Sequence, residues 1–231
     1  MTYNTACMSF ARRIELRLER LFEGVSATVF GGKTERLDIE NKILRTADLE
    51  MFDHPTGPSV PNVYTLFLHP ENLPLVPDAT TAADLEKVIT ATAMEEGWRL
   101  EGPVSVTIIS DPTLPTRSMR CESQTVSSPQ EPWANLLGTS GNVAYPVTHI
   151  RSLIGRDKDC DVQIMQADVS RHHAVLFARN SQAWIYDLGS SNGTRVNDIG
   201  VAATPVLVRP DDYINVGSHR LTLKRVYEAR S

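Results

Sequence analysis

The sequence predicts two domains of different fold class, an α+β domain followed by an all-β sandwich. The first 121 residues contain long apolar stripes at helical spacing between a few strand-like runs. Residues 131–231 instead contain many short apolar runs separated by Gly, Asp, Asn and Ser turns. A length of 231 residues is ample for two domains. We therefore place the domains at 1–121 and 131–231, joined by a short linker at 122–130.

The first domain is predicted to have the element order α-α-β-α-β-β. Helical stripes lie at 9–24, from about 35 to 51, and from 85 to a stop at Gly97. The proline-rich stretch 55–61 ends the second of these helices. Strand patterns lie at 63–68 and 104–108, and residues 116–122 are expected to pair back onto the second strand as a hairpin. This order is typical of a compact α+β domain.

The second domain shows no helical stripe. Its apolar runs lie at 133–137, 144–147, 152–154, 162–165, 174–177, 183–186, 214–216 and 221–226. Many short strands at this spacing predict an antiparallel β-sandwich. The segment that precedes it, "ESQTVSSPQEP", is polar and proline-punctuated, which predicts a linker and leaves Thr125 accessible to a kinase.

Composition places the chain among ordinary globular proteins. It is 41% hydrophobic and 22% charged, and no apolar stretch approaches the roughly 18 residues needed to span a bilayer. The three cysteines, Cys7, Cys121 and Cys160, are odd in number and lack CxxC spacing. The sequence also opens without the pattern of a secretory signal. These features predict a cytoplasmic protein without disulfides and without a membrane-inserted segment.

The charge is divided unevenly between the two halves. Residues 1–130 carry 12 Lys and Arg against 18 Asp and Glu, and residues 131–231 carry 11 against 10. Neither half has the single-sign basic field that general nucleic-acid binding requires, so no nucleic-acid partner is predicted. An anion site in the second half must therefore be local.

Three loops of the second half carry polar residues that suit such a site. The first ends in Gly155-Arg156, the second is residues 170–174, "SRHHA", and the third is residues 187–194, "DLGSSNGT". Arginine offers a planar fork of charged donors, serine a compact hydroxyl, and asparagine an amide that can tie two backbones together. If the loops converge at one end of the sandwich, they form a small receptacle for a dianion held on a peptide.

The same residues allow a catalytic alternative. Ser170, His173 and Asp187 could act as nucleophile, base and orienting acid. However, no G-x-S-x-G elbow surrounds Ser170, and nothing in the sequence supplies an evident oxyanion site. A hydrolase using Ser170 and His173 remains the alternative to binding, and no catalytic residue is predicted.

Metal and nucleotide sites are also weakly supported. His172, His173, His219 and Cys160 lack a spaced ligand set, and adjacent residues on a strand point to opposite faces. The stretch "GGKT", residues 31–34, lacks the first glycine of a phosphate-binding loop and the strand that leads into one. We therefore predict no metal and no cofactor, and interpret "GGKT" as a glycine turn.

The stretches "LIGRDKDCDVQI", "DVSRHHAVL" and "DLGSSNGTRVN" resemble the forkhead-associated (FHA) family. The family signature is Gly-Arg, then Ser-x-x-His, then Asn-Gly, and all three appear here in order. The resemblance covers about residues 131–228. It implies an eleven-stranded β-sandwich whose apical loops bind phosphothreonine peptides.

The resemblance also implies roles for individual residues. Arg156 and Ser170 would contact the phosphate, Arg171 and Ser191 would be further phosphate neighbours, and Asn192 would bind the peptide backbone.

Three further residues, Gly155, His173 and Gly193, match family positions that shape the loops. His173 would brace the Ser170 loop through a hydrogen bond. His172 occupies a variable family position and receives no role.

The first domain is similar to the N-terminal domain of actinobacterial FhaA-type proteins. The similar stretches are "SFARRIELRLERLFEGVSATVFGG", "NVYTLFLHPE", "EEGW" and "GPVSVTII". The family usually has a much longer linker before its FHA domain.

This second resemblance implies a cytoplasmic scaffold that works with membrane Ser/Thr kinases controlling peptidoglycan synthesis and cell division. Its implied partners are phosphothreonine-containing proteins, either such kinases or the phosphorylated kinase-like domain of a peptidoglycan-precursor flippase, which would recruit it to the inner face of the membrane. We therefore expect a non-catalytic phosphothreonine-dependent adaptor. Besides the hydrolase, the remaining alternative is a structural protein whose FHA fold binds no ligand.

Overall fold

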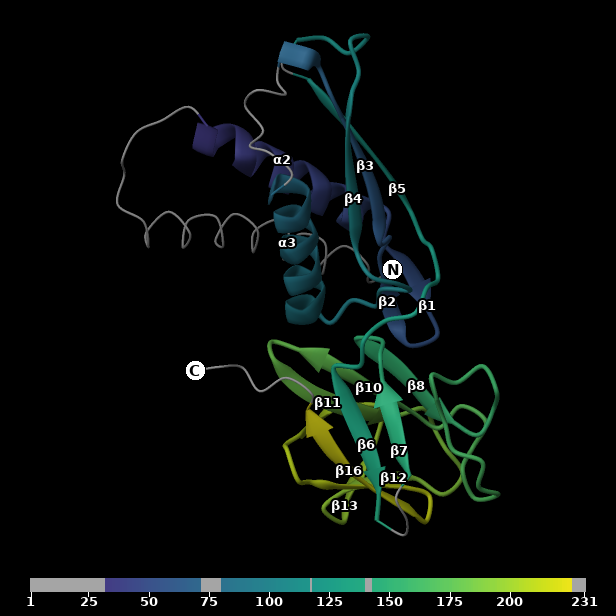
Figure 1. Cartoon of the computed structure of the whole chain (residues 1–231). Helices are drawn as coiled ribbons and strands as arrows, with labels where there is room; N and C mark the ends of the chain where they lie inside the picture. The colour runs from purple at the N-terminus through teal and green to yellow at the C-terminus, as the bar shows by residue number, and fades with distance from the viewer. Residues whose placement is uncertain (1–31, 72–79, 117, 140–142, 226–231) are drawn as a thin grey trace.

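The computed structural model describes residues 32–71, 80–116, 118–139 and 143–225. Two lobes are stacked end to end, with the N-terminal lobe above the C-terminal lobe in the view of Figure 1. The helix predicted at 9–24 lies outside the described residues. Within the described ranges, neither helix has the length and apolar character needed to cross a bilayer.

The N-terminal lobe packs two helices against a three-stranded sheet of order β4-β3-β5. Its main elements are α2 (Gly32–Leu49), β3 (Val63–Leu68), α3 (Thr80–Glu96), β4 (Ser105–Ser110) and β5 (Met119–Gln124). Every second residue of β3 is buried, as expected for a strand with one face against helices. Tyr64 and Leu66 pack there with Ile43 of α2 and Ile89 of α3. The helix α3 ends before Gly97, whose φ of +71° suits a glycine after a helix end.

The predicted hairpin between the last two strands of this lobe is wrong, because β5 pairs with β3 instead of β4. The strands β3 and β4 are parallel, since the crossover through α3 brings the chain back to its starting end. Because β3 and β4 are parallel, a strand that is antiparallel to β4 is also antiparallel to β3. It can therefore pair with either of them without changing its direction. The sequence pattern therefore predicts the direction of β5 but does not determine its edge.

The N-terminal lobe also contains a hairpin that was not predicted. The strands β1 (Phe52–His54) and β2 (Gly57–Ser59) pair across the start of the proline-rich stretch 55–61, for which only a helix stop was predicted. Gly57 has a φ of +118°, which a side chain would strain. The residues of "GGKT" that are described, from Gly32 on, form the start of α2 and no separate glycine turn.

The C-terminal lobe is a sandwich of a five-stranded sheet, β14-β11-β10-β8-β9, and a six-stranded sheet, β13-β12-β15-β16-β6-β7. The strands are β6 (Ala134–Gly138), β7 (Ala144–Val147), β8 (Arg151–Gly155), β9 (Val162–Gln163), β10 (Ala174–Arg179), β11 (Gln182–Asp187), β12 (Thr194–Val196), β13 (Ile199–Val201), β14 (Val206–Val208), β15 (Tyr213–Val216) and β16 (His219–Arg225). The two sheets form the predicted β-sandwich, and its core includes the fully buried Leu136, Ile154, Leu176, Ile185 and Ile214.

The sandwich differs from the prediction in two details. The strands β8 and β9 are parallel, so the sandwich is not purely antiparallel. The short strands β12, β13 and β14 were not predicted. The turn between β12 and β13 is Asn197-Asp198, both at positive φ, which is the usual signal of a two-residue hairpin.

The two lobes are joined by a segment that packs on the N-terminal lobe. The strand β5 continues through Gln124, so residues 122–124 of the predicted linker belong to the first domain's sheet. The side chain of Asn62 then holds Val126 from both sides, with Nδ2 donating to its carbonyl at 3.0 Å and Oδ1 accepting from its amide at 2.9 Å. Ile150 and Ala178 of the sandwich complete the hydrophobic core of the N-terminal lobe. The lobes therefore share a packed interface.

Candidate anion-binding site

An open cavity of about 590 Å³ lies among the loops that follow β8, precede β10 and follow β11. These loops are on the right of the lower lobe in Figure 1. Its lining is Arg156, Asp157, Ala167, Asp168, Val169, Ser170, Arg171, His172, Ser191 and Asn192. The structure thus brings together all five residues predicted to contact a phosphopeptide.

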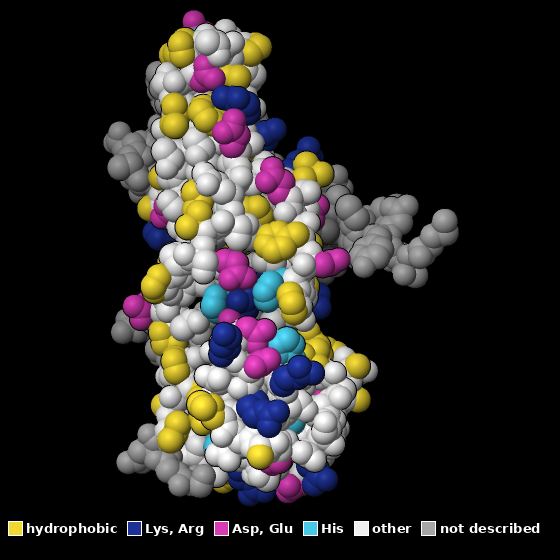
Figure 2. All heavy atoms as spheres, turned by 90° about the vertical axis from the view of Figure 1, so that its right-hand side faces the viewer, with side chains coloured by type: hydrophobic (Ala, Val, Ile, Leu, Met, Phe, Trp, Pro, Cys, Tyr) yellow, Lys and Arg dark blue, Asp and Glu magenta, His cyan; other side chains and the backbone are white. Residues whose placement is uncertain are grey.

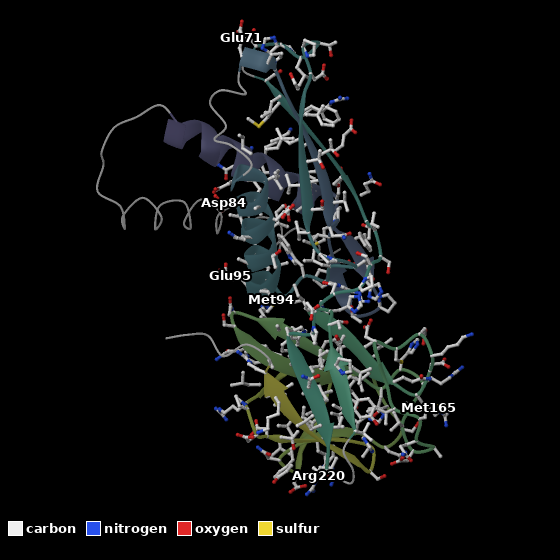
Figure 3. The ribbon with its side chains drawn as sticks, in the orientation of Figure 1. Glu71, Asp84, Met94, Glu95, Met165 and Arg220 are labelled. Carbon is white, nitrogen blue, oxygen red and sulfur yellow. The ribbon has the colours of Figure 1, made fainter. Side chains whose placement is uncertain are left out.

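The cavity lies at the end of the sandwich away from the linker. The Gly217 amide, just before β16, donates to the carbonyl of Gly193 beside the cavity at 3.1 Å. The opposite end of β16, Arg225, pairs with Ala134, the first residue of β6 after the linker. Seven residues of β16 separate these ends, roughly 20 Å of extended chain. Figure 3 accordingly shows Arg220 near the lower end of the lobe, far from the N-terminal lobe.

Gly155 allows the first and second loops to touch. A Cβ at this position would lie 2.0 Å from the carbonyl oxygen of Arg171 and 2.8 Å from Sγ of Cys160. The close approach lets the amide of Arg156 donate to the carbonyl of Ser170 at 3.0 Å. The next amide, that of Asp157, donates to the carbonyl of Arg171 at 3.2 Å. A side chain at residue 155 would push these loops apart.

Arg156 and Arg171 supply exposed positive charge at the cavity. Nη1 of Arg156 donates to the carbonyl of Ala167, in the segment between β9 and β10, at 3.3 Å. Guanidinium groups bind oxyanions through paired, charge-assisted hydrogen bonds. Figure 2 shows Lys and Arg side chains gathered on this face of the lower lobe.

His173 is fully buried behind the cavity and joins the second and third loops. Its Nδ1 accepts a hydrogen bond from the amide of Ser170 at 3.0 Å. The ring proton therefore lies on Nε2, which faces the carbonyl of Gly193 at 3.1 Å. The Oγ atom of Ser170 accepts from the amide of Ser191 at 3.0 Å, so the same two loops are joined a second time.

This arrangement disfavours the hydrolase alternative. Catalysis would need a ring nitrogen of His173 to accept the hydroxyl proton of Ser170. Instead, Nδ1 accepts from the Ser170 backbone, and Nε2 donates to a backbone carbonyl. Asp187 lies 3.8 Å from Nε2, but its carboxylate is occupied within its own loop. The geometry fits a histidine that orients a loop.

Asp187 organises the third loop from its base. Its Oδ1 accepts from the amides of Gly189 at 2.8 Å and Ser190 at 2.7 Å. Its Oδ2 accepts from the hydroxyls of Ser190 at 2.7 Å and Thr194 at 2.5 Å. Burial alone would raise the pKa of Asp187, but these hydrogen bonds outweigh burial and hold it below its ordinary value. The carboxylate is therefore ionised at neutral pH and fixes the loop.

Asn192 and Asp168 link the third loop to the second and to β16. Nδ2 of Asn192 donates to the carbonyl of Asp168 at 2.7 Å. The carboxylate of Asp168 accepts from the amide of Ser218 at 2.6 Å, and hydrogen bonds from Ser218 lower the pKa of Asp168. Gly193 has a φ of +75°, which favours glycine in this turn. No role was predicted for Asp168, although it is the first residue of the "DVSRHHAVL" stretch.

Among the described residues, a cluster with metal-binding atoms lies beside the cavity, at Asp159, Cys160 and His172. Nε2 of His172 lies 2.9 Å from Oδ2 of Asp159. The thiol of Cys160 donates to the carbonyl of Arg171, and burial together with nearby carboxylates raises its pKa to about 11. The Cys160 thiol and the His172–Asp159 pair therefore both connect the first loop to the second. The cluster fits a loop contact better than a metal site.

The family relationship agrees with this geometry. Residues 11–122 match the model of the FhaA N-terminal domain, and residues 152–217 match the model of the FHA domain. The chain joins an FhaA N-terminal domain to an FHA domain.

Curated relatives of this chain include the transcriptional regulatory protein EmbR of Mycobacterium tuberculosis. It is 32% identical over 103 residues, which is 45% of this chain and 26% of EmbR. The proliferation marker protein Ki-67 of Mus musculus is 31% identical over 72 residues, 31% of this chain and 2% of Ki-67. The match therefore spans about a quarter of EmbR and a small part of Ki-67.

Similar solved structures include Mycobacterium tuberculosis EmbR in complex with a low-affinity phosphopeptide. That similarity has 31% identity and a TM-score of 0.39, and covers 42% of this chain and 26% of the EmbR chain. Another is the FhaA FHA domain complexed with the intracellular domain of Rv3910, with 25% identity and a TM-score of 0.36. It covers 39% of this chain and 99% of that chain.

Proposed function

We propose that this chain is a non-catalytic adaptor whose FHA domain binds phosphothreonine-containing proteins. The observation that carries the proposal is the convergence of Arg156, Ser170, Arg171, Ser191 and Asn192, from three separate loops, on one open cavity. A phosphate monoester carries about −1.5 to −2 charges at neutral pH. Two exposed guanidinium groups and neighbouring hydroxyl and amide donors match that charge.

The residues behind the cavity support the proposal because they hold the loops in place before a ligand arrives. His173 and Asp187 are buried and hydrogen-bonded to the backbones of the second and third loops. Gly155 permits the contact between the first two loops, and Gly193 permits the turn of the third. A preformed site loses less conformational entropy on binding. We assign these residues the role of shaping the loops.

The family of the N-terminal domain is the basis for our assignment of a signalling system. Because residues 11–122 belong to an FhaA N-terminal domain, we assign the chain to bacterial Ser/Thr kinase signalling linked to peptidoglycan synthesis and cell division. Its partners in this proposal are phosphorylated Ser/Thr kinases or the phosphorylated kinase-like domain of a peptidoglycan-precursor flippase. Such partners would recruit it from the cytoplasm to the inner face of the membrane.

The test is selection from a peptide library with a fixed central phosphothreonine, followed by calorimetric titration of the best peptide. We expect its phosphoserine and unphosphorylated forms to bind more weakly. Arg156→Ala should lower the affinity of the phosphothreonine peptide about tenfold to a hundredfold, which is about 1.5 to 3 kcal/mol. Arg120→Ala is the control, because Arg120 lies on β5 of the other lobe. Equal binding of phosphorylated and unphosphorylated peptides would instead favour a structural FHA fold without a ligand.

The partner class is tested separately with the full chain. It is immobilised and offered the intracellular domain of a kinase, or the kinase-like domain of the flippase, before and after phosphatase treatment. Retention that is lost on phosphatase treatment and in the Arg156→Ala variant supports the assignment. Retention that survives both changes would place the contact outside the cavity.

A further inference from the structure

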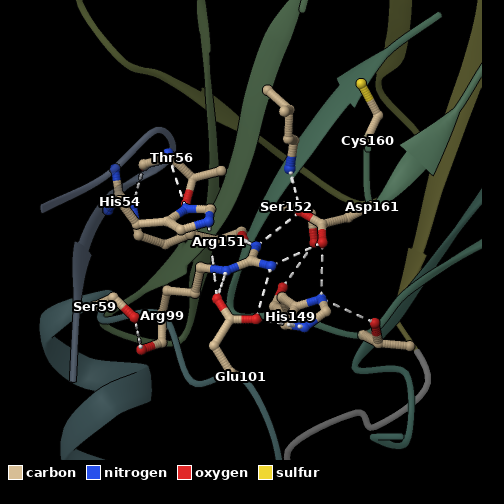
Figure 4. Close-up of polar contacts among 12 residues, drawn as sticks. His54, Thr56, Ser59, Arg99, Glu101, His149, Arg151, Ser152, Cys160 and Asp161 are labelled. Carbon is tan, nitrogen blue, oxygen red and sulfur yellow. Dashed lines mark hydrogen bonds and ion pairs between the residues drawn. The ribbon is translucent and has the colours of Figure 1, made fainter. Parts of the chain in front are cut away.

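The N-terminal domain inserts a buried arginine into the FHA domain. Arg99, which is 4% exposed, donates through Nη1 to Oδ2 of Asp161 at 2.7 Å and through Nη2 to Oδ1 at 2.9 Å. Its Nε donates to Oε1 of Glu101 at 2.5 Å. The guanidinium thus lies between a carboxylate of its own lobe and one of the sandwich (Figure 4). A two-pronged contact of this kind fixes orientation as well as distance.

Asp161 is the last residue of the loop that begins at Arg156. Its Oδ2 also accepts from the amide of Leu153 on β8 at 2.7 Å. Nη1 of Arg99 donates in addition to the carbonyl of Arg151, at the start of the same strand, at 2.6 Å. Arg99 therefore holds both β8 and the last residue of the loop 156–161, which we call the phosphate loop.

Hydrogen bonds hold the shape of the loop between Arg156 and Asp161. The amide of Cys160 donates to the carbonyl of Asp157 at 3.2 Å, which closes a turn. Nε2 of Gln163 donates to the carbonyl of Arg156 at 3.1 Å. Residues 156–161 therefore form a short bonded segment between the cavity and Asp161. Figure 2 shows acidic and histidine side chains at the interface between the two lobes, which we call the seam. They lie directly above the basic side chains of the lower lobe.

A second buried arginine joins the lobes without reaching this loop. Arg151 donates through Nε to the carbonyl of Thr56 at 2.5 Å and through Nη1 to the carbonyl of Gly97 at 3.0 Å. Its guanidinium lies over the ring of Phe177, with 4.3 Å to the ring centre. The seam therefore contains one arginine that only joins the lobes and one that also reaches the phosphate loop.

We propose that Arg99 is a positioning residue for the phosphate loop, so that docking of the N-terminal domain raises the affinity of the FHA cavity. This inference rests on the proposed phosphopeptide function. Coupling between two sites is reciprocal. Occupation of the cavity must then also tighten the docking of the N-terminal domain.

The first experiment compares affinities in the full chain. The phosphothreonine peptide selected above is titrated into the wild type and into Arg99→Gln, Arg99→Lys and Asp161→Asn. We expect Arg99→Gln and Asp161→Asn to bind the peptide at least roughly fivefold more weakly than the wild type. Arg99→Lys should lie between them and the wild type, because lysine keeps the charge but loses the fork.

Two controls separate positioning from loss of stability. Ile89→Val creates a small defect in the buried core of the N-terminal lobe, and Arg151→Lys weakens the seam without removing a bond to Asp161. At an equal loss of melting temperature, both should bind the peptide more tightly than Arg99→Gln. Affinity that follows melting temperature alone across all variants would overturn the proposal.

The second experiment uses amide hydrogen exchange, and its first comparison needs only the wild type. In the wild type, the peptide should slow exchange in residues 98–101 of the N-terminal lobe, and unchanged exchange there would overturn the coupling. Without peptide, Arg99→Gln should speed exchange in residues 153–161. This readout stands apart from the proposed function: failure of the wild type to bind any phosphopeptide refutes the function, whereas binding with uncoupled lobes refutes only this inference.

Discussion

Replacement of His173 by alanine should lower stability and phosphopeptide affinity together. The substitution leaves two backbone groups without partners, the amide of Ser170 and the carbonyl of Gly193. An unsatisfied group costs about 1 to 3 kcal/mol when fully buried. Both groups here are half-buried, so we expect the free energy of unfolding to fall by about 2 kcal/mol, the low end for two groups. For a chain of this length, about 1 kcal/mol corresponds to roughly 2 to 4 °C in melting temperature. The loops that carry Ser170 and Ser191 should also loosen.

The assay is urea unfolding of both proteins beside calorimetric titration of the selected phosphothreonine peptide. His172→Ala is the matched control for stability, because this neighbouring ring is exposed and its contact is a hydrogen bond with Asp159. It is not a control for affinity, since His172 lines the cavity. Removing an exposed pair should cost no more than about 1 kcal/mol. An esterase assay on both proteins adds the catalytic alternative to the comparison.

Two results would refute this reasoning. If His173→Ala unfolds at the same urea concentration as the wild type, the two backbone bonds do not stabilise the loops. If the wild type turns over an ester and His173→Ala keeps its fold but loses that turnover, the histidine is a base and the hydrolase alternative is right.

Three further predictions concern the loops, the seam and the linker. Gly155→Ala should destabilise the chain by about 1 to 3 kcal/mol and weaken peptide binding, because its Cβ would lie 2.0 Å from the carbonyl oxygen of Arg171; unchanged urea unfolding would contradict this. Burial would raise the pKa of Asp161, but hydrogen bonds from His149 and Arg99 hold it well below its ordinary value, so its contribution to stability is present above about pH 4 and is lost as pH falls further. The stability difference between wild type and Asp161→Asn, measured by urea unfolding, should therefore shrink from pH 7 to pH 3. Phosphorylated Thr125 should give concentration-dependent dimers in light scattering, since the linker is at the opposite end of the sandwich from the cavity; a compact monomer that no longer binds added phosphopeptide would contradict that placement.

The convergence of three polar loops was predictable from their residue types and their order, whereas the roles of the single residues came from the family resemblance and stay predictions. Arg156, Ser170 and Asn192 occur in short motifs whose order follows the order of the loops, and the structure places them around one cavity. The supporting bonds were less visible. Asp187 was considered only as an acid of a triad, yet it accepts four hydrogen bonds from its own loop, a role that depends on the exact turn geometry.

The domain seam could not be predicted from sequence. Arg99 and Asp161 are 62 residues apart, and each resembles an ordinary surface charge in its local sequence. Only the packed arrangement of the lobes buries them together. The edge occupied by β5 is a similar case, since its direction follows from the strand pattern but its neighbour depends on how the crossover through α3 fills the sheet.

The most direct test of the proposed phosphothreonine binding is a nitrogen-15 NMR titration of the full chain with the selected peptide in phosphorylated and unphosphorylated forms. The phosphorylated peptide should shift the amide signals of Arg156, Ser170, Ser191 and Asn192, and the unphosphorylated peptide should leave them in place at the same concentration. Equal shifts with both peptides, or phosphate-dependent shifts confined to residues outside the cavity, would contradict the account.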